Sequence, residues 1–198
     1  GSAISADATG GTFTNLTGPI YSETASGNVG VGTIILKAPS GFIFDTGGTA
    51  PTVLITRLTG SGANANNING VSSGTVVAMT SVTTTQLVFT VTKGSAGGIT
   101  CRLTWQNVRV RPAAGTPLAS GYLRVNGTAS ILGVTTNSNF GVLREVVGAA
   151  RKLAMQTQPS STATAGVVFA QQPVIQVQDQ FGNFRTNDNT TVVEGAGQ

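Results

Sequence analysis

Apolar and polar residues alternate with a period of two along most of this chain. In residues 86–93, Leu87, Phe89 and Val91 share one face of an extended strand, and threonines occupy the other. This alternation is typical of antiparallel sheets that bury one face. Loops rich in glycine and proline separate the runs, and no helical period of useful length interrupts them. The expected strands are residues 33–38, 51–58, 75–80, 86–93, 101–112, 121–127 and 140–147.

These runs predict an all-β fold. Many short strands without helices favour an antiparallel β-sandwich of about nine or ten strands over residues 1–149. Small residues around Gly148 end this domain, and Lys152 begins a further strand. We therefore expect the domain change at 148–153, with a second β-domain over residues 150–198.

One expected strand breaks its own alternation. Its apolar positions are Cys101, Leu103, Trp105, Val108 and Val110. A strand changes its buried face only where a residue is inserted, so we expect a β-bulge near Gln106 and Asn107. The alternative is that both faces are partly buried there.

Few residues of the chain suit catalysis. Histidine is absent, which removes the commonest general base and metal ligand, and the single cysteine excludes an intrachain disulfide. Only 9% of the residues are charged, against about 25% in an ordinary soluble domain. The carboxylates of residues 1–149 are Asp7, Glu23, Asp45 and Glu145. With one Trp and two Tyr, the chain offers little of the aromatic cleft of a glycosidase, so we expect no enzyme and no cofactor.

The net charge of +4 does not by itself predict a nucleic-acid-binding protein, because the eleven basic residues form no run. Arg109 and Arg111 would share one face of a strand, which we interpret as a solvated sheet face. The functional alternative is attraction to an acidic glycan or to the cell envelope. No stretch approaches the roughly 20 apolar residues of a membrane span, so we expect no membrane insertion.

The candidate ligand-binding residues are Trp105, Tyr21, Tyr122, Arg109 and Arg111. Because Cys101 and Trp105 lie on the apolar face of their strand, we expect both to be buried core residues. An exposed Trp105 would instead favour a binding module.

Asp179 and Asp188 are candidate Ca²⁺ ligands, together with the asparagines beside Asp188. Two carboxylates are few for an ion that takes about 6–8 oxygens, and turns use the same residues. Lys37 would suit a Lys–Asn isopeptide bond if Glu23 or Asp45 lay nearby as the assisting carboxylate, although a solvated lysine at a strand end is the simpler interpretation.

The C-terminal quarter of the chain carries a resemblance. It contains Gln158-Pro159, then Ala165-Gly166, then a strand that ends in "VQDQFGN" at residues 177–183. This pattern resembles the opening strands of bacterial immunoglobulin-like repeats, as in invasin- and intimin-type surface proteins. Residues 1–149 more loosely resemble β-sandwich modules of long bacterial surface proteins.

The residues of the last strand fit this resemblance. Ile175 and Val177 would face inward, and the glutamines between them outward. Asp179 would accept backbone N–H bonds at the start of the turn. Gly182 and Asn183 are residues that tolerate positive φ.

The second domain is shorter than the repeat it resembles. Residues 152–198 number only 47, whereas immunoglobulin-like sandwiches need about 100. Residues 152–198 should therefore not form a closed monomeric domain. Three explanations stay open: a fragment of a longer tandem array, a piece cut at an arbitrary point, or a domain that another copy completes with its own strands.

These observations together predict a structural segment of a secreted or cell-surface bacterial protein, in which tandem β-domains form a stalk, sheath or fibre. Its partners would be other domains of a longer chain or further copies. The alternatives are a ligand-binding adhesin or carbohydrate-binding module, and a self-assembling fibre subunit.

Overall fold

The computed structural model describes residues 2–186. The chain divides into two compact units, Gly1–Val146 and Val147–Gln198, called unit 1 and unit 2 below. The division falls just before the 148–153 interval predicted from the sequence. Each unit is described by itself.

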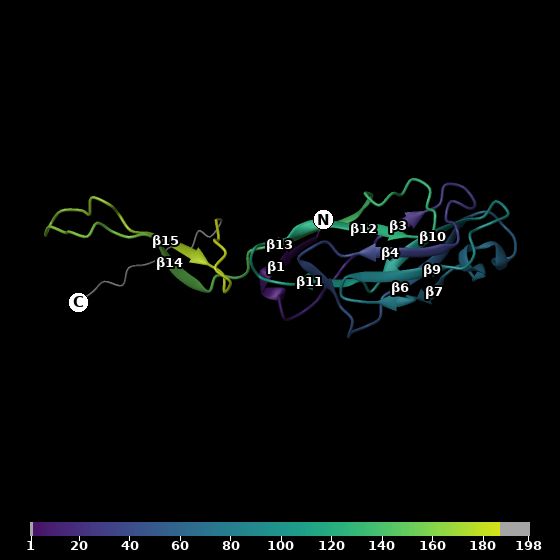
Figure 1. Cartoon of the computed structure of the whole chain (residues 1–198), viewed down its shortest axis with the longest axis horizontal. Coiled ribbons are helices and arrows are strands. Elements are labelled where there is room, and N and C mark those ends of the chain that lie inside the picture. The colour runs from purple at the N-terminus through teal and green to yellow at the C-terminus, as the bar shows by residue number, and fades with distance from the viewer. Residues whose placement is uncertain (1, 187–198) are drawn as a thin grey trace. The chain divides into compact units, whose positions relative to one another are not determined.

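The described residues are all-β, as Figure 1 shows. The strands of unit 1 are β1 (Ser2–Ser5), β2 (Thr14–Asn15), β3 (Ile20–Ser22), β4 (Gly32–Lys37), β5 (Phe42–Phe44), β6 (Thr52–Thr59), β7 (Thr75–Ala78), β8 (Ser81–Val82), β9 (Gln86–Val91), β10 (Thr100–Gln106), β11 (Arg109–Pro112), β12 (Ser120–Gly127) and β13 (Asn139–Val146). Unit 2 contributes β14 (Lys152–Thr157) and β15 (Val174–Gln178).

The prediction of a nearly helix-free chain is confirmed for the described residues. Helical structure there consists of three 3₁₀ turns of three residues each, Ala6–Ala8, Asn64–Asn66 and Ile68–Gly70. Within residues 2–186, no helix has the length and apolar character that crossing a bilayer requires.

Unit 1 has three sheets. Their strand orders are β1-β13-β12-β4-β9-β8, β3-β10-β6-β7 and β2-β11-β5. The strand pairings within residues 2–146 are antiparallel except the one between the first and last strands of the unit. There β1 runs parallel to β13, with Ser2 opposite Leu143 and Ser5 opposite Val146. The expectation of a purely antiparallel unit is wrong at this edge.

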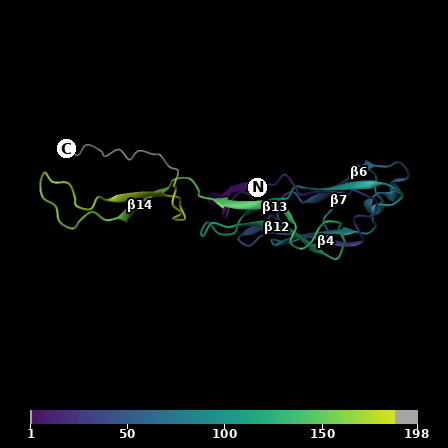
Figure 2. The same cartoon turned by 90° about the horizontal axis from the view of Figure 1, so that it is seen from above.

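The core of unit 1 lies between the six-stranded and four-stranded sheets. Figure 2 shows β6 and β7 on one side of the unit and β12 and β4 on the other. Trp105 of β10 meets Phe140 of β13 edge to face, with ring centroids 6.4 Å apart. Trp105 is 1% exposed and Cys101 0%, so the prediction that both are buried is confirmed. Each such fully buried apolar side chain contributes about 1.5–3 kcal/mol.

The predicted β-bulge near Gln106 and Asn107 is replaced by a break between two sheets. β10 ends at Gln106 in the four-stranded sheet, and β11 begins at Arg109 in the three-stranded sheet. Asn107 between them has φ +56°, in the left-handed region that asparagine tolerates better than most residues. The shift of apolar face in the sequence thus marks a strand that leaves one sheet and enters another.

Unit 2 contains a two-stranded antiparallel ribbon in which Lys152 pairs with Gln178 and Leu153 with Val177. Leu153 is 55% exposed, Met155 47% and Ile175 46%. The expectation that Ile175 faces inward is therefore wrong for the described residues, because no second layer there covers the ribbon. Val192 and Val193, which we expected to share this apolar face, lie outside the described residues.

Candidate functional site

Among the carboxylates of residues 2–186, Asp179, at the turn that follows β15, accepts four hydrogen bonds. It is 0% exposed. Its Oδ1 accepts the backbone N–H groups of Phe181 and Asn183, each at 2.9 Å. Gly182 inside the turn has φ +90°. The predicted turn, with Asp179 as acceptor and Gly182 at positive φ, is confirmed, but Asn183 does not adopt positive φ.

The other oxygen of Asp179 reaches back to the first residues of unit 2. Its Oδ2 accepts the backbone N–H of Gly148 at 2.9 Å and the side-chain amide of Asn183 at 2.8 Å. The guanidinium of Arg185 donates to the carbonyl of Gly148. Both backbone groups of Gly148 are therefore held by the turn at residues 179–185, which we call the Asp179 clamp.

Hydrogen bonding sets the charge state of this carboxylate. Burial alone would raise the pKa of Asp179, but the donors from Asn183, Gly148 and Phe181 favour the ionised form more strongly. The pKa of Asp179 is consequently held below its ordinary value. The clamp is thus intact at neutral pH.

The same geometry argues against Asp179 as a calcium ligand. Its two oxygens already accept four N–H donors, which fills the roughly four lone-pair sites of a carboxylate. Across residues 2–186, no three His, Cys, Asp or Glu side chains gather in a way that suits a metal ion. The second candidate, Asp188, lies outside the described residues.

Trp105 does not bind a ligand at the surface. Its side chain is enclosed in the core of unit 1, with 1% of its area exposed. The proposal of Trp105 as a ligand-binding residue is therefore wrong. The alternation of its strand had already placed Trp105 on the apolar face, which is buried.

Arg109 is engaged within unit 1. Its Nη2 lies 2.8 Å from Oδ2 of Asp45. The other oxygen of Asp45 accepts the N–H groups of Gly47 and Gly48 at 2.8 and 3.2 Å, so the loop folds over the guanidinium. A Cβ at Gly48 would lie 1.3 Å from Arg109 Nη2, so a side chain there would require the guanidinium to move. Arg109 thus fastens the loop after β5 to β11.

Arg111 is also used internally. Its guanidinium lies over the ring of Phe13, 4.5 Å from the centroid, and donates to the carbonyl of Gly11 at 2.7 Å. Arg109 and Arg111 share a strand face, but both hold neighbouring segments. The expectation that they form a free, solvated basic face is wrong.

The two tyrosines have different surroundings. Tyr21 on β3 donates to the carbonyl of Leu132 at 3.0 Å, and burial, followed by the negative charge of Glu23, raises the pKa of its hydroxyl. Tyr122 on β12 is 47% exposed. The guanidinium of Arg124 lies 5.7 Å from the centroid of its ring. Of the aromatic candidates, Tyr122 is therefore the one with a platform open to solvent.

Glu23 is a buried carboxylate that the sequence did not single out for burial. It is 4% exposed, and its two oxygens accept the backbone N–H groups of Val29 at 3.0 Å and Cys101 at 2.8 Å. Burial raises the pKa of the Cys101 thiol, and the Glu23 charge adds to this effect. Glu23 fixes the segment after β3 against β10.

The geometry gives no support to an isopeptide bond at Lys37. The two carboxylates that could assist such a bond are already engaged, Glu23 with two backbone N–H groups and Asp45 with Arg109. Lys37 itself is exposed at the end of β4. The simpler interpretation of a solvated lysine fits these contacts.

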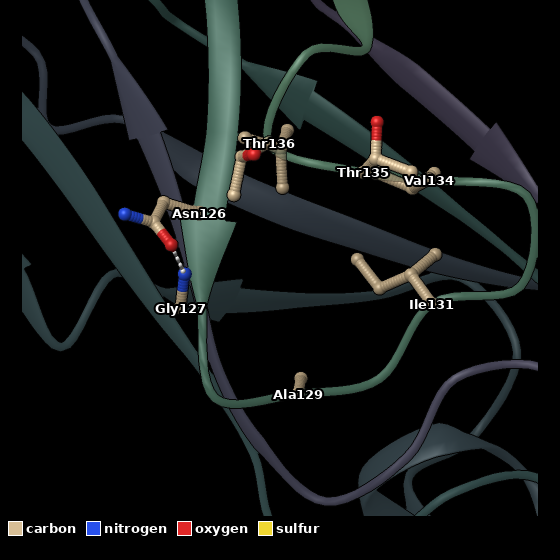
Figure 3. Close-up of a pocket in the computed structure, with 8 residues that line it drawn as sticks. Asn126, Gly127, Ala129, Ile131, Val134, Thr135 and Thr136 are labelled. Atoms are coloured by element: carbon tan, nitrogen blue, oxygen red, sulfur yellow. Dashed lines mark hydrogen bonds between the residues drawn. The ribbon is translucent and has the colours of Figure 1, made fainter.

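Two pockets of unit 1 have linings that do not suit acid–base chemistry. The pocket in Figure 3 has a volume of about 180 Å³. It lies under the loop between β12 and β13, and Ile131, Val134 and Thr135 are among its lining residues. A second pocket, of about 320 Å³, lies where Leu16 and Pro19 approach β12 and β13. Neither lining contains an ionisable side chain.

No protein-family model, curated protein or solved structure matches this chain.

Proposed function

We propose that this chain is a load-bearing structural segment of a secreted or cell-surface bacterial protein. The observation that carries the proposal is the parallel pairing of β1 with β13. The chain enters unit 1 at the start of β1 and leaves it at the end of β13. Tension along the chain therefore pulls these two neighbouring strands in opposite directions along their length.

This geometry resists tension because the bonds are loaded together. The pairs from Ser2–Leu143 to Ser5–Val146 lie in one parallel register. In shear, all of them must break in one step before the strands slide. If both strands were pulled from the same end, the bonds would break one after another at lower force. A stalk or fibre module benefits from the first arrangement.

The connection between the units is short, which also supports a structural role. Val146 is the last residue of unit 1 in a strand pairing, and it is opposite Ser5. Gly148 is held by the Asp179 clamp of unit 2. Only Val147 lies between them.

Within this proposal, unit 1 is a β-sandwich of the six-stranded and four-stranded sheets, and unit 2 is the opening of an immunoglobulin-like domain. The residues that support the latter are those of the clamp, which follow the "VQDQFGN" pattern. The buried carboxylates favour a structural module over an enzyme, because Glu23 and Asp179 both accept hydrogen bonds from backbone N–H groups.

A self-assembling fibre subunit is the second candidate. It is favoured by the apolar ribbon of unit 2, where Leu153, Met155 and Ile175 are each about half exposed. Burying one such side chain contributes about 1.5–3 kcal/mol. Strands from a neighbouring copy that packed on this face would therefore be stabilised.

Single-molecule force spectroscopy of the intact chain, pulled through its two ends, tests the load-bearing role. We expect unit 2 to yield at low force and unit 1 in one cooperative event at high force. Unfolding of its roughly 145 residues would lengthen the chain by about 500 Å. Gradual extension of unit 1 without a force peak would refute the proposal.

A further inference from the structure

The outer face of the six-stranded sheet carries three basic side chains in unit 1. Strand alternation turns Arg144 of β13, Arg124 of β12 and Lys37 of β4 away from the core, since their neighbours Leu143, Leu123 and Leu36 are buried. Tyr122 of β12 points the same way. These four residues are called the cationic face below. The one acidic residue on these three strands, Glu145, is buried on the core side.

The cationic face extends across the three neighbouring strands β13, β12 and β4. Lys37 is directly opposite Arg124, and Arg144 is directly opposite Ser120. Ser120 and Arg124 are four residues apart, which is about 13 Å along a strand. Tyr122 lies midway between these two residues on β12, with Arg124 beside its ring.

The stability of the fold does not explain this arrangement. Like charges directly opposite each other on neighbouring strands are destabilising, and Lys37 and Arg124 form such a pair. Other basic residues of unit 1 hold the structure together: Arg57 donates to Asn67 at 2.8 Å, and Arg109 pairs with Asp45. Arg124 donates one hydrogen bond to the carbonyl of Asn137 at 3.2 Å. In contrast, the side chains of Lys37 and Arg144 make no hydrogen bond or ion pair within residues 2–186.

We propose that the cationic face binds an acidic polysaccharide whose sugars carry carboxylate groups. Lys37 and Arg124 would pair with one carboxylate group of the polymer, and Arg144 with another further along it. The half-exposed ring of Tyr122 would stack on the apolar face of a sugar between them.

Neutral polar groups flank the cationic face and complete the match to a sugar. Gln86 is opposite Lys37 on β9, and Asn126 follows Arg124 on the same face of β12. Both suit hydrogen bonds to sugar hydroxyls. A single exposed aromatic among three cations suits a nucleic acid less well, since single-stranded nucleic acids are bound through several stacked bases. The proposal goes beyond the load-bearing role and does not depend on it.

Affinity electrophoresis of the intact 198-residue chain through gels containing polygalacturonate tests the proposal. We expect retardation at low salt that weakens as salt rises. The triple variant K37Q/R124Q/R144Q should bind about 3- to 150-fold more weakly, as expected for three exposed ion pairs. The control variant R102Q/R151Q/K152Q removes the same charge from other exposed positions and should bind like the native chain.

The role of the ring has its own variants. Tyr122→Ala should weaken binding, whereas Tyr122→Phe should retain it, because stacking needs the ring and not the hydroxyl. Circular dichroism of each variant checks that the fold is kept.

Several results would overturn the proposal: no retardation by polygalacturonate, equal retardation by neutral dextran, or equal losses in the two triple variants. Tighter binding to single-stranded DNA or to anionic lipid vesicles than to polygalacturonate would also overturn it. None of these results would bear on the force needed to unfold unit 1.

Discussion

Replacing Asp179 by asparagine should release Gly148 from the clamp. The substitution keeps the size of the side chain but turns one acceptor oxygen into a donor NH₂ group. Oδ1 would keep its two bonds within the turn, and the NH₂ would face the N–H of Gly148, to which Oδ2 now binds at 2.9 Å. A hydrogen bond to a charged group contributes about 1.5–3 kcal/mol. This loss corresponds to a factor of about 10 to 150 in the local opening equilibrium.

Amide hydrogen exchange at Gly148 measures that factor directly, because exchange reports the opening of single hydrogen bonds. We expect Asp179→Asn to reduce the protection of the Gly148 amide by about 10- to 150-fold. Asp45→Asn makes the same chemical change in a turn of unit 1 and should leave Gly148 protected. Unchanged protection of Gly148 in Asp179→Asn would refute the clamp.

The clamp should also have a defined pH dependence. The pKa of Asp179 is lowered in the folded chain, so its contribution to stability is complete above the unfolded pKa of the carboxyl group. It is lost as the pH falls through the lower folded value. Protection of Gly148 should therefore persist from neutral pH down past the ordinary range of an aspartate. A decline already near neutral pH would contradict the assignment.

Three further predictions concern unit 1. Cys101 is buried with a raised pKa, so a thiol reagent at mildly alkaline pH should label it slowly in the folded chain and rapidly in urea; equal rates would contradict its burial. Glu23→Ala leaves the buried N–H groups of Val29 and Cys101 without an acceptor and should lower the free energy of unfolding by about 2–6 kcal/mol in urea titrations; a change below about 1 kcal/mol would be inconsistent with these bonds. Asn107→Gly should be tolerated at φ +56°, whereas Asn107→Val should cost about 1–2 kcal/mol, and equal stability of the two variants would exclude the left-handed conformation.

The long strands and the burial of Trp105 could be predicted from the sequence because both follow from local alternation. The period of two in residues 86–91 and 101–105 leaves one face to bury, and the structure buries it. Strands of two or three residues, such as β2 and β8, are too short to show a period. Unit 1 therefore has thirteen strands in its described residues rather than the nine or ten expected.

The parts of the candidate sites that depend on distant residues could not be predicted. The turn bonds of Asp179 join neighbours in sequence and were expected, but its bond to Gly148 spans 31 residues. Arg109 lies beside Asp45 because β11 pairs with β5. The pairing of β1 with β13 could not be predicted either, because nothing in the four residues of β1 indicates which strand they pair with.

Force spectroscopy in two pulling directions tests the load-bearing claim most directly. Handles at Ser2→Cys and Ala150→Cys load β1 and β13 in shear, whereas handles at Gly11→Cys and Ala150→Cys load both strands from the same end. The buried Cys101 does not compete for attachment. The parallel pairing predicts a clearly higher unfolding force for unit 1 in the first direction than in the second. Equal forces in the two directions would contradict it.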